Sequence, residues 1–559
     1  MDKIKIQKWV ISNSEPNPLE LLQEEMRSQE TYIKVNAIHQ IPTVATVMGP
    51  ESVRTELVPY LWTLMNEEDE VLFALAQELG KLSAFAPGST FVPMLESLAS
   101  LEETVVREQA VASLSKVADL LPDSEVISVL IPVVLKLAQA DNFSSRISAC
   151  SLFVSAFPRA GNEREKLWNK FVDLSHEDTP MVRRSAVKQM GKIAQTLEKQ
   201  SLVTDLVPDL RQLAQDEQDQ VRILCVETIL EIASLLNKEE NKLHTLPIVL
   251  LVGEDKSWRV RYHFAEMFPR VVKAFGKEIT ESSLIQTFSQ LLRDTEADVK
   301  SIALDSLNEI YTSISIEKIM SFIFPNLETI ISDYSLPPKV RKNAASALGN
   351  LSKALDKNLS LEKLLPSVVS LLKEETNYEI KINSLESLGN LAEVIGKDMV
   401  TQELLNLLKE QAKEAPQWRV RETVFKVVGE LCKVLVRDSS FEEVFSSGDN
   451  SFQETFLQFL SDSVCQVRET GLKVLEELSS LMPSEWVSSA LLPKLKAAFE
   501  ENLSYLHRIT LLWALSKVKL SSDELLPILT KASKDPVPNV RFVVCKVIGQ
   551  HQDKQAFQG

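Results

Sequence analysis

This 559-residue chain has few residues that could take part in catalysis or bind a metal ion, and their spacing fits neither a catalytic site nor a metal site. Its six histidines form no HxxxH or HExxH pattern, and no pair of them lies near a cysteine at metal-ligand spacing. The sequence holds 15 glycines and lacks the GxGxxG, GxxxxGK[ST] and GxSxG motifs. Acidic residues are abundant, but a solvated face accounts for them better than catalysis does. We therefore expect a protein that is not an enzyme and that uses no cofactor and no metal ion.

The cysteines and the charge balance indicate where such a protein works and what it binds. The five cysteines are far apart with no CxxC pair, so we expect reduced, mostly buried thiols of an intracellular protein: Cys150, Cys225, Cys432, Cys465 and Cys545. A net charge of −17 disfavours a nucleic-acid partner and favours basic surfaces of other proteins. No run of 18 apolar residues occurs, so we expect neither secretion nor a membrane span. A cytoplasmic location follows, and a nuclear one is compatible.

A Trp-Arg-Val-Arg sequence that occurs twice, at 258–261 and 418–421, points to protein binding instead. We expect each tryptophan to lie in a loop, two residues before the valine that begins a buried helix face. Large aromatic side chains beside arginine are typical of protein interfaces. Packing in the core is the alternative for Trp258 and for Trp418.

The Val-Arg part of this sequence is one copy of a repeat. A branched apolar residue followed by a basic one returns at intervals near 39 residues, as in Val182-Arg183, Val221-Arg222 and Val260-Arg261. With degenerate copies there are fourteen second positions, which we call the markers: Lys34, Leu72, Arg107, Arg146, Arg183, Arg222, Arg261, Lys300, Arg341, Lys381, Arg421, Arg468, Arg508 and Arg541.

A proline or its equivalent precedes most markers by 13 to 16 residues, as Pro208 precedes Arg222, and we expect it to open a first helix, A. The marker then lies near the start of a second helix, B. A hairpin of roughly 40 residues cannot bury its apolar faces alone, so the hairpins must stack. The sequence therefore predicts an all-α HEAT-repeat α-solenoid of about 14 hairpins, a curved elongated rod. We expect a lead-in at 1–17, one solenoid at 18–550 with a longer turn at 437–451, and a polar tail at 551–559.

The turns between helices A and B should lie along one edge of the solenoid and stack into a ridge. This ridge is acidic, and a helix N-terminus favours acids through its dipole: NEEDE (66–70), LEE (101–103), HED (176–178), DEQD (216–219), GED (253–255) and DTEAD (294–298). Two roles are open for the arginine of each Val-Arg pair. It contacts a partner protein, or it forms an ion pair with an aspartate of the neighbouring repeat; we call a series of such ion pairs along the solenoid a ladder.

Several longer segments resemble one known family, the scaffold (A) subunits of protein phosphatase 2A. The resemblance covers roughly residues 18–548 and rests on repeat-specific segments such as EDEVLFALAQELG (68–80), LEETVVREQAV (101–111), EDTPMVRRSAV (177–187), EDKSWRVRY (254–262), NLSYLHRIT (502–510) and DPVPNVRF (535–542). It implies a non-catalytic scaffold that assembles a serine/threonine phosphatase heterotrimer. Residues 18–315 would hold a B-type regulatory subunit, and residues 400–550 would hold the phosphatase catalytic subunit.

The resemblance also implies which ridge residues contact each partner. The regulatory subunit would bind Glu70, Pro180, Arg183, Arg184, Trp258 and Arg259. The catalytic subunit would bind Trp418, Arg419, Tyr505 and Arg508. Two departures weaken the expected contacts, because Asn142 stands where the family usually has tryptophan and we count fourteen repeats where it typically has fifteen.

A second class of protein also fits the repeat pattern. Acidic HEAT solenoids include nuclear-transport receptors and other adaptors that wrap basic cargo. Such receptors are generally longer, and they show no repeat-by-repeat match to this chain. No nucleic acid, membrane or small-molecule substrate is expected in either case.

Overall fold

The computed structural model describes residues 17–82, 87–437, 457–481, 487–501, 504–518, 520 and 522–550. These residues are helical with no strand among them, which confirms the all-α solenoid prediction. The expected lead-in (except Asn17), the long turn (except Arg437) and the polar tail lie outside these ranges. The chain forms two compact units, Met1–Phe275 and Gly276–Gly559, each described by itself below.

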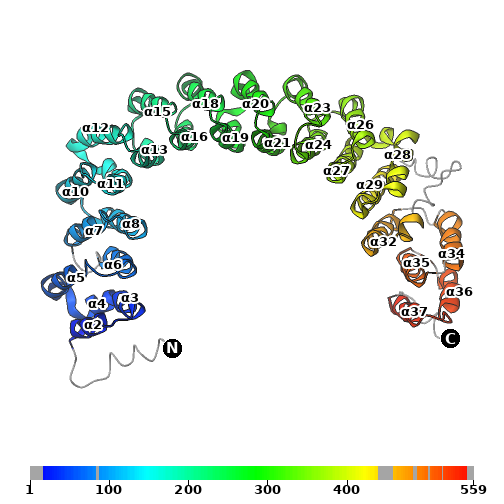
Figure 1. Cartoon of the computed structure of the whole chain (residues 1–559), viewed down its shortest axis with the longest axis horizontal. Helices are drawn as coiled ribbons and strands as arrows, with labels where there is room; N and C mark the ends of the chain where they lie inside the picture. Colours follow the sequence, from blue (N-terminus) through cyan, green and yellow to red (C-terminus); the bar gives the residue numbers. More distant parts are fainter. Residues whose placement is uncertain are drawn as a thin grey trace. The chain divides into compact units, whose positions relative to one another are not determined.

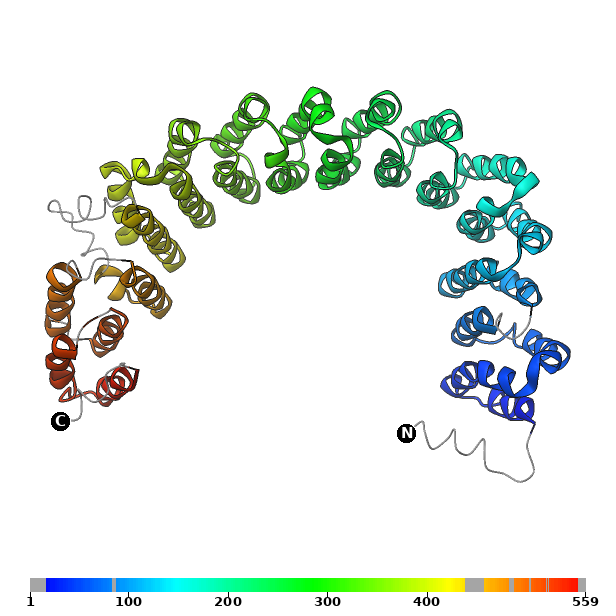
Figure 2. The same ribbon diagram turned by 180° about the vertical axis from the view of Figure 1, so that it is seen from behind.

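Within each unit the helices form two layers, one of A helices and one of B helices (Figures 1 and 2). The A helices of the first unit are α2 (Pro18–Met26), α4 (Ile41–Ser52), α5 (Val58–Thr63), α7 (Val92–Leu98), α10 (Ile131–Ala138), α12 (Arg164–Ser175), α15 (Val207–Leu213) and α18 (Leu246–Gly253). Its B helices are α3 (Thr31–His39), α6 (Asp69–Leu82), α8 (Thr104–Leu120), α11 (Phe143–Ala156), α13 (Pro180–Ala194), α16 (Asp219–Ala233) and α19 (Trp258–Ile279), which crosses the unit boundary at its end.

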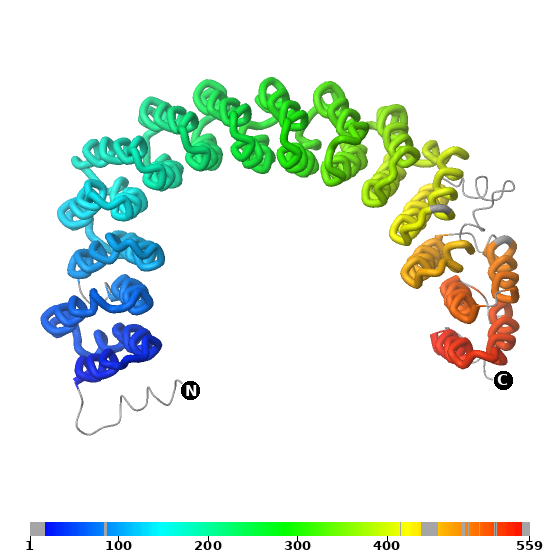
Figure 3. Tube along the Cα trace, in the orientation of Figure 1, coloured from blue at the N-terminus to red at the C-terminus, as the bar shows by residue number. Residues whose placement is uncertain are grey.

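The second unit repeats this arrangement (Figure 3). Its described A helices are α20 (Ile285–Leu292), α23 (Phe324–Ser332), α26 (Leu365–Glu374), α28 (Gln402–Glu414), α34 (Leu492–Glu501) and α36 (Ser522–Ala532). Its B helices are α21 (Ala297–Ile310), α24 (Pro338–Leu351), α27 (Tyr378–Ile395), α29 (Trp418–Arg437), α32 (Cys465–Ser479), α35 (Tyr505–Lys517) and α37 (Pro538–Gln550). Each of the fourteen markers falls in the first part of one B helix, so the repeat period located the hairpins correctly.

The apolar residue before the marker anchors each B helix in the core. Val182, Val221, Val340 and Val420 are all buried, and successive B helices pack side by side, as α13 does on α16 and α24 on α27. At Gly349 the absence of a side chain leaves room for a close approach of α24 and α27. A Cβ added there would lie 2.6 Å from the Ser387 Cβ of α27.

The prolines of the A helices lie in the first turn of an α-helix, as the sequence predicted, but further helical turns that were not predicted come before them. In the segment around Pro208, a short helix (α14, Lys199–Ser201) and a five-residue π-helical stretch (η6, Leu202–Leu206) come before α15. A π turn, whose hydrogen bonds span one residue more than in an α-helix, accommodates a residue that has no N–H and a bulky ring. Similar π stretches precede α5, α10, α18, α23, α26 and α34, each of which carries a proline as its second residue.

Candidate partner-binding ridge

The first residues of the B helices occupy equivalent positions in successive repeats. We call the first two residues of the B helices of one unit its helix-start ridge. In most repeats with a marker arginine, this arginine closes the turn before the helix, because its Nη1 donates to two backbone carbonyls five and six residues earlier; Arg341 instead donates to the Ile331 carbonyl. Arg261 donates to Asp255 and Lys256, and Arg421 donates to Ala415 and Pro416. Each B helix begins three residues before its marker, in the repeats with a lysine or leucine marker as well.

Trp258 and Trp418 occupy the same place in this geometry. Each is the first residue of its helix, α19 or α29, and each is half-buried with an exposed arginine after it. The guanidinium carbon of Arg259 lies 4.8 Å from the Trp258 ring centroid, and that of Arg419 lies 4.6 Å from the Trp418 ring centroid. The loop placement expected from the sequence is wrong, because the marker arginine closes the turn so that the helix already starts at the tryptophan.

A guanidinium stacked on an indole gives each pair a flat apolar face and a fixed positive charge. Such a cation–π contact contributes about 0.5–1 kcal/mol at exposed sites. It also orders two side chains before any partner arrives, which reduces the entropy lost on binding. The two pairs therefore have the chemistry of interface anchors rather than of core residues.

The marker arginines themselves form the ladder that was the alternative reading of the sequence. The Nε and Nη2 atoms of Arg183 lie 2.7 and 2.8 Å from the two carboxylate oxygens of Asp216 in the next repeat. Arg421 and Asp462 form the same bidentate pair, and so do Arg508 and Asp535. The side chains of Arg183 and Arg508 are only 12% and 14% exposed. Because their guanidinium groups already pair with aspartates, a partner protein would contact only the small exposed part of each side chain.

The ladder keeps both of its partners charged. Burial works against ionisation of Asp216, but hydrogen bonds from Arg183 and from the Gln218 N–H, with the charges of Arg183 and Arg222, hold its pKa below the ordinary value. The hydrogen bond to Asp216 raises the pKa of Arg183 further above neutrality. Asp462 and Asp535 show the same lowered pKa, with burial opposing ionisation and an arginine and a backbone N–H favouring it.

Most of the other predicted contact residues lie on the ridge. Glu70 is the exposed second residue of α6, Pro180 is the half-buried first residue of α13, and Tyr505 is the first residue of α35 with 40% of its surface exposed. Arg184 lies one turn further along α13, where its Nη1 is 3.8 Å from the Sδ of the exposed Met181. The acidic segments precede the B helices as predicted, and Glu103 caps α8 by accepting from the Val105 N–H.

The sequence reasoning overlooked a row of exposed apolar side chains on the ridge. Each lies two or three positions before a marker, and this offset could have been used to find the row in the sequence. The residues are Tyr32, Val105, Phe143 and Met181 in the first unit and Tyr378 and Leu506 in the second. Grouped exposed apolar residues on a soluble protein usually mark an interaction surface.

Other chemistry has little support in the described part of the chain. No group of three or more His, Cys, Asp or Glu side chains there could hold a metal ion, and none of the helices there is long and apolar enough to cross a membrane. Cys150, Cys225 and Cys432 are buried free thiols, while Cys465 and Cys545 are exposed, so the expectation of mostly buried thiols is confirmed for three of the five.

Solved structures and one family model agree on the fold class: the chain is a HEAT-repeat α-solenoid. A HEAT-repeat model matches residues 525–550, and a model described as PIK3R4-like, middle domain, matches residues 170–324. A structure of Kap95p with RanGDP covers 95% of this chain and 70% of its own at a TM-score of 0.55 and 16% identity. A crystal structure of importin beta covers 95% and 76% at a TM-score of 0.55 and 13% identity. At such low identity these two structures speak for the fold alone.

The sequence comparisons are more specific, and they confirm the family resemblance. The chain is related in sequence to the scaffold (A) subunits of protein phosphatase 2A. It is 35% identical over 367 residues to the beta isoform of the human 65 kDa regulatory (A) subunit, over 64% of this chain and 61% of that protein. It is 34% identical over 270 residues to the Schizosaccharomyces pombe regulatory (A) subunit, over 47% and 46%, and 40% identical over 198 residues to the Dictyostelium discoideum scaffold subunit, over 34% of each. The matched regions thus span less than two thirds of these relatives.

Proposed function

We propose that this chain is a non-catalytic scaffold of a protein phosphatase 2A-type holoenzyme. In this proposal the helix-start ridge of residues 18–315 holds a B-type regulatory subunit, and that of residues 400–550 holds the phosphatase catalytic subunit. The observation that carries the proposal is the pair of stacked Trp-Arg anchors, Trp258-Arg259 and Trp418-Arg419, in a chain related to known scaffold subunits.

The regulatory-subunit surface would use Glu70, Pro180, Arg183, Arg184, Trp258 and Arg259. Its centre would be Trp258, because half-buried aromatic anchors dominate the binding energy of interfaces. Around it, the exposed Phe143 and Met181 would add apolar area, and Glu70 would supply charge.

The catalytic-subunit surface would use Trp418, Arg419, Tyr505 and Arg508. Tyr505 brings a large aromatic ring with a polar tip and is followed by the exposed Leu506. Arg508 would contribute mainly by fixing the start of α35 through Asp535, because that carboxylate already occupies two of its donors.

Reciprocal substitutions test this assignment. Purified chain is immobilised, and its binding to a phosphatase catalytic subunit is measured separately from its binding to a B-type regulatory subunit. Trp258→Ala should weaken regulatory-subunit binding by about 2 kcal/mol and leave catalytic-subunit binding intact, and Trp418→Ala should do the reverse. Trp62→Ala removes an exposed tryptophan from the A helix α5 and is the matched control that should change neither. Equal loss of both partners in either ridge variant would contradict the two-surface proposal.

A nuclear-transport receptor remains the competing class, because the fold matches importin beta. The phosphatase assignment has the stronger support, since the sequence identity over the matched regions is 35% to a phosphatase scaffold but 13% to importin beta. Binding of a Ran-type GTPase in the same assay, without binding of a phosphatase catalytic subunit, would favour the transport receptor.

A further inference from the structure

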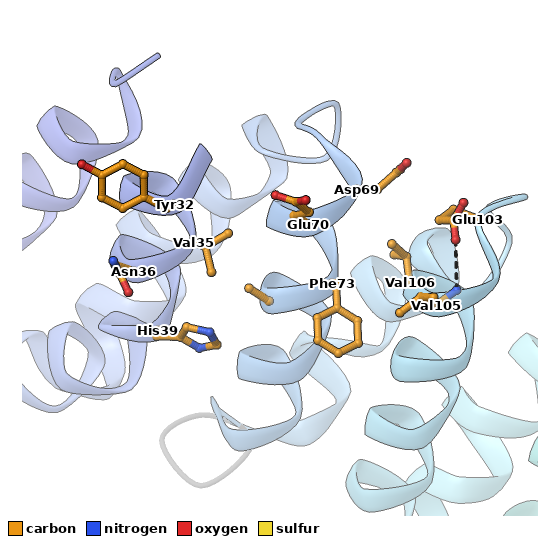
Figure 4. A pocket seen from close by; sticks show the side chains of 11 residues that line it. Tyr32, Val35, Asn36, His39, Asp69, Glu70, Phe73, Glu103, Val105 and Val106 are labelled. Carbon is orange, nitrogen blue, oxygen red and sulfur yellow. Dashed lines mark hydrogen bonds between the residues drawn. The ribbon is translucent and has the colours of Figure 1, made fainter. Parts of the chain in front are cut away.

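An open groove of about 600 Å³ lies across three B helices at the start of the first unit. Figure 4 shows side chains of α3, α6 and α8 lining the same space, among them Tyr32, Phe73 and Val105. Most of its surface is apolar, and Tyr32 and Val105 are 65% and 57% exposed. An apolar surface of this kind in contact with water favours an apolar occupant.

The charge around the groove has one sign. Asp69, Glu70 and Glu103 belong to its lining and are exposed, whereas the lining residues include no lysine and no arginine. Lys34 lies nearby on α3, but its ammonium is already paired with Glu67. Among the described residues, Asp69 and Glu70 take part in no ion pair that would neutralise them. The groove therefore suits a segment that combines apolar side chains with several positive charges.

This chain contains such a segment. Residues 3–11 read KIKIQKWVI, in which three lysines, Lys3, Lys5 and Lys8, are interleaved with Ile4, Ile6 and the Trp9-Val10-Ile11 run, with no acid. In an extended strand Ile4, Ile6 and Val10 would share one face with Lys8, and Trp9 and Ile11 would share the other with Lys3 and Lys5. Either face would therefore bring apolar side chains to the groove floor and at least one lysine to the acids at its edge.

The linker has sufficient length. Residues 12–16 join this segment to Asn17 and span up to about 17 Å when extended. The helix α2 that follows has nine residues, about 13 Å of helix, and packs against α3, which forms one wall of the groove. A linker of this length lets the segment fold back along α2 toward α3.

We infer that residues 3–11 dock intramolecularly in the groove formed by α3, α6 and α8. The occupant would cover Glu70, so it would compete with any partner that uses that residue. The inference does not depend on the proposed phosphatase function, because its test contains only this chain.

The test uses the full chain at a concentration where it is monomeric, with a photoreactive benzoylphenylalanine in place of Trp9. After illumination, crosslinked peptides are identified by mass spectrometry. Docking predicts crosslinks to residues 32–39, 69–74 or 103–106. The double variant Glu70→Lys with Glu103→Gln should lower their yield roughly fivefold, since it removes the attraction of two exposed carboxylates. Gln at position 103 keeps the oxygen that accepts from the Val105 N–H, so the cap of α8 is preserved.

Two controls make the result decisive. Glu217→Lys changes an exposed acid in another A–B turn of the same unit and should leave the yield unchanged. Adding Lys5→Glu and Lys8→Glu to the double variant should restore the crosslinks, because it re-creates opposite charges. Crosslinks that fall elsewhere on the chain, that join two copies of it, or that are insensitive to Glu70→Lys would overturn the inference.

Discussion

Arg222 and Asp255 form a bidentate ion pair between successive repeats, with Nε–Oδ2 and Nη2–Oδ1 distances of 2.7 and 2.9 Å. Only 3% and 6% of their side chains are exposed. Asp255 has two further functions, since its Oδ1 accepts from the Ser257 N–H and its backbone carbonyl accepts from Arg261 of its own repeat. One residue thus joins the preceding repeat to the turn that starts α19.

Removing one partner of this pair should be costly. Asp255→Ala leaves the Arg222 guanidinium buried without a carboxylate, and we expect a loss of about 3–5 kcal/mol of unfolding free energy. Urea unfolding followed by circular dichroism measures it. Arg222→Met with Asp255→Leu should cost less than Asp255→Ala alone, because no buried charge is left unpaired. Arg541→Ala is the matched control, because Arg541 is exposed and, among the described residues, donates to the carbonyls of Asp535 and Pro536 and to no carboxylate; its effect should stay below about 1 kcal/mol.

The ladder also predicts an acid limit to stability. Asp216, Asp462 and Asp535 have pKa values lowered by folding, so each favours the folded state when ionised. That contribution is complete above the unfolded-state pKa of about 3.9 and is lost as the pH falls through the lower folded-state pKa. We expect the urea midpoint to fall steeply below about pH 4. Asp216→Asn should flatten this fall, and a midpoint that stays constant down to pH 3 would refute the prediction.

The close approach of α24 and α27 predicts a position that tolerates no side chain. A Cβ at Gly349 would lie 2.6 Å from the Ser387 Cβ and 2.7 Å from its Cα, so backbone must move. We expect Gly349→Ala to destabilise the second unit by about 1–3 kcal/mol in urea titrations. Gly389→Ala, on the same helix α27 with nothing within 4 Å of its added Cβ, should instead stabilise by up to about 1 kcal/mol through helix propensity. Equal effects of the two substitutions would show that the contact does not matter.

Asn142 links stability to the proposed ridge. Its Oδ1 accepts from the Ser145 N–H at 3.0 Å and caps α11, and its Nδ2 donates to the Ser100 carbonyl of the preceding repeat at 3.1 Å. We expect Asn142→Trp to cost about 1 kcal/mol of stability through the lost cap and to tighten regulatory-subunit binding by adding an aromatic side chain directly before the ridge residue Phe143. Asn142→Ala should show the same stability loss with no gain in affinity, measured by thermal melting and by titration calorimetry.

Thiol reactivity should divide the cysteines into two groups. Burial raises the pKa of the Cys150 thiol to about 12 and that of Cys432 well above its usual value, so neither forms a reactive thiolate in the native chain. Cys465 and Cys545 are exposed. With a maleimide reagent at pH 7, mass spectrometry should find native-state labelling at these two residues and labelling of all five cysteines only in denaturant. Rapid native labelling of Cys150 would contradict the packing around α11.

The hairpins could be predicted well from the sequence because the same residue pattern occurs once in each repeat. The Val-Arg pair and its degenerate copies located every described B helix, since the apolar residue must be buried and the marker follows it directly. The ladder was foreseen as an alternative, but its acid partners needed the structure, because Asp255 lies 33 residues from Arg222 and turns differ in length.

Other features of the site were harder to predict from the sequence. Arg259 stacks on Trp258 only in particular side-chain rotamers, which the order of the residues does not reveal. The start of the helix at Trp258 depends on which backbone carbonyls accept hydrogen bonds from Arg261, and this too requires the structure. The π turns before the prolines were missed because a proline near an apolar run reads as a helix start. The groove of α3, α6 and α8 combines side chains from three repeats, so no single stretch of sequence contains it.

Between α32 and α35 the marker arginine meets a neutral partner. The Nε of Arg468 donates to the neutral Thr510 hydroxyl at 3.1 Å, where Arg421 and Arg508 meet carboxylates. A hydrogen bond to a hydroxyl resists separation less than a bidentate ion pair does. When the second unit is placed under tension, as between two beads in an optical trap, this junction should open at a lower force than the junctions held by Arg421–Asp462 and Arg508–Asp535. Of these three junctions, the one with the hydroxyl partner thus sets where the unit separates first.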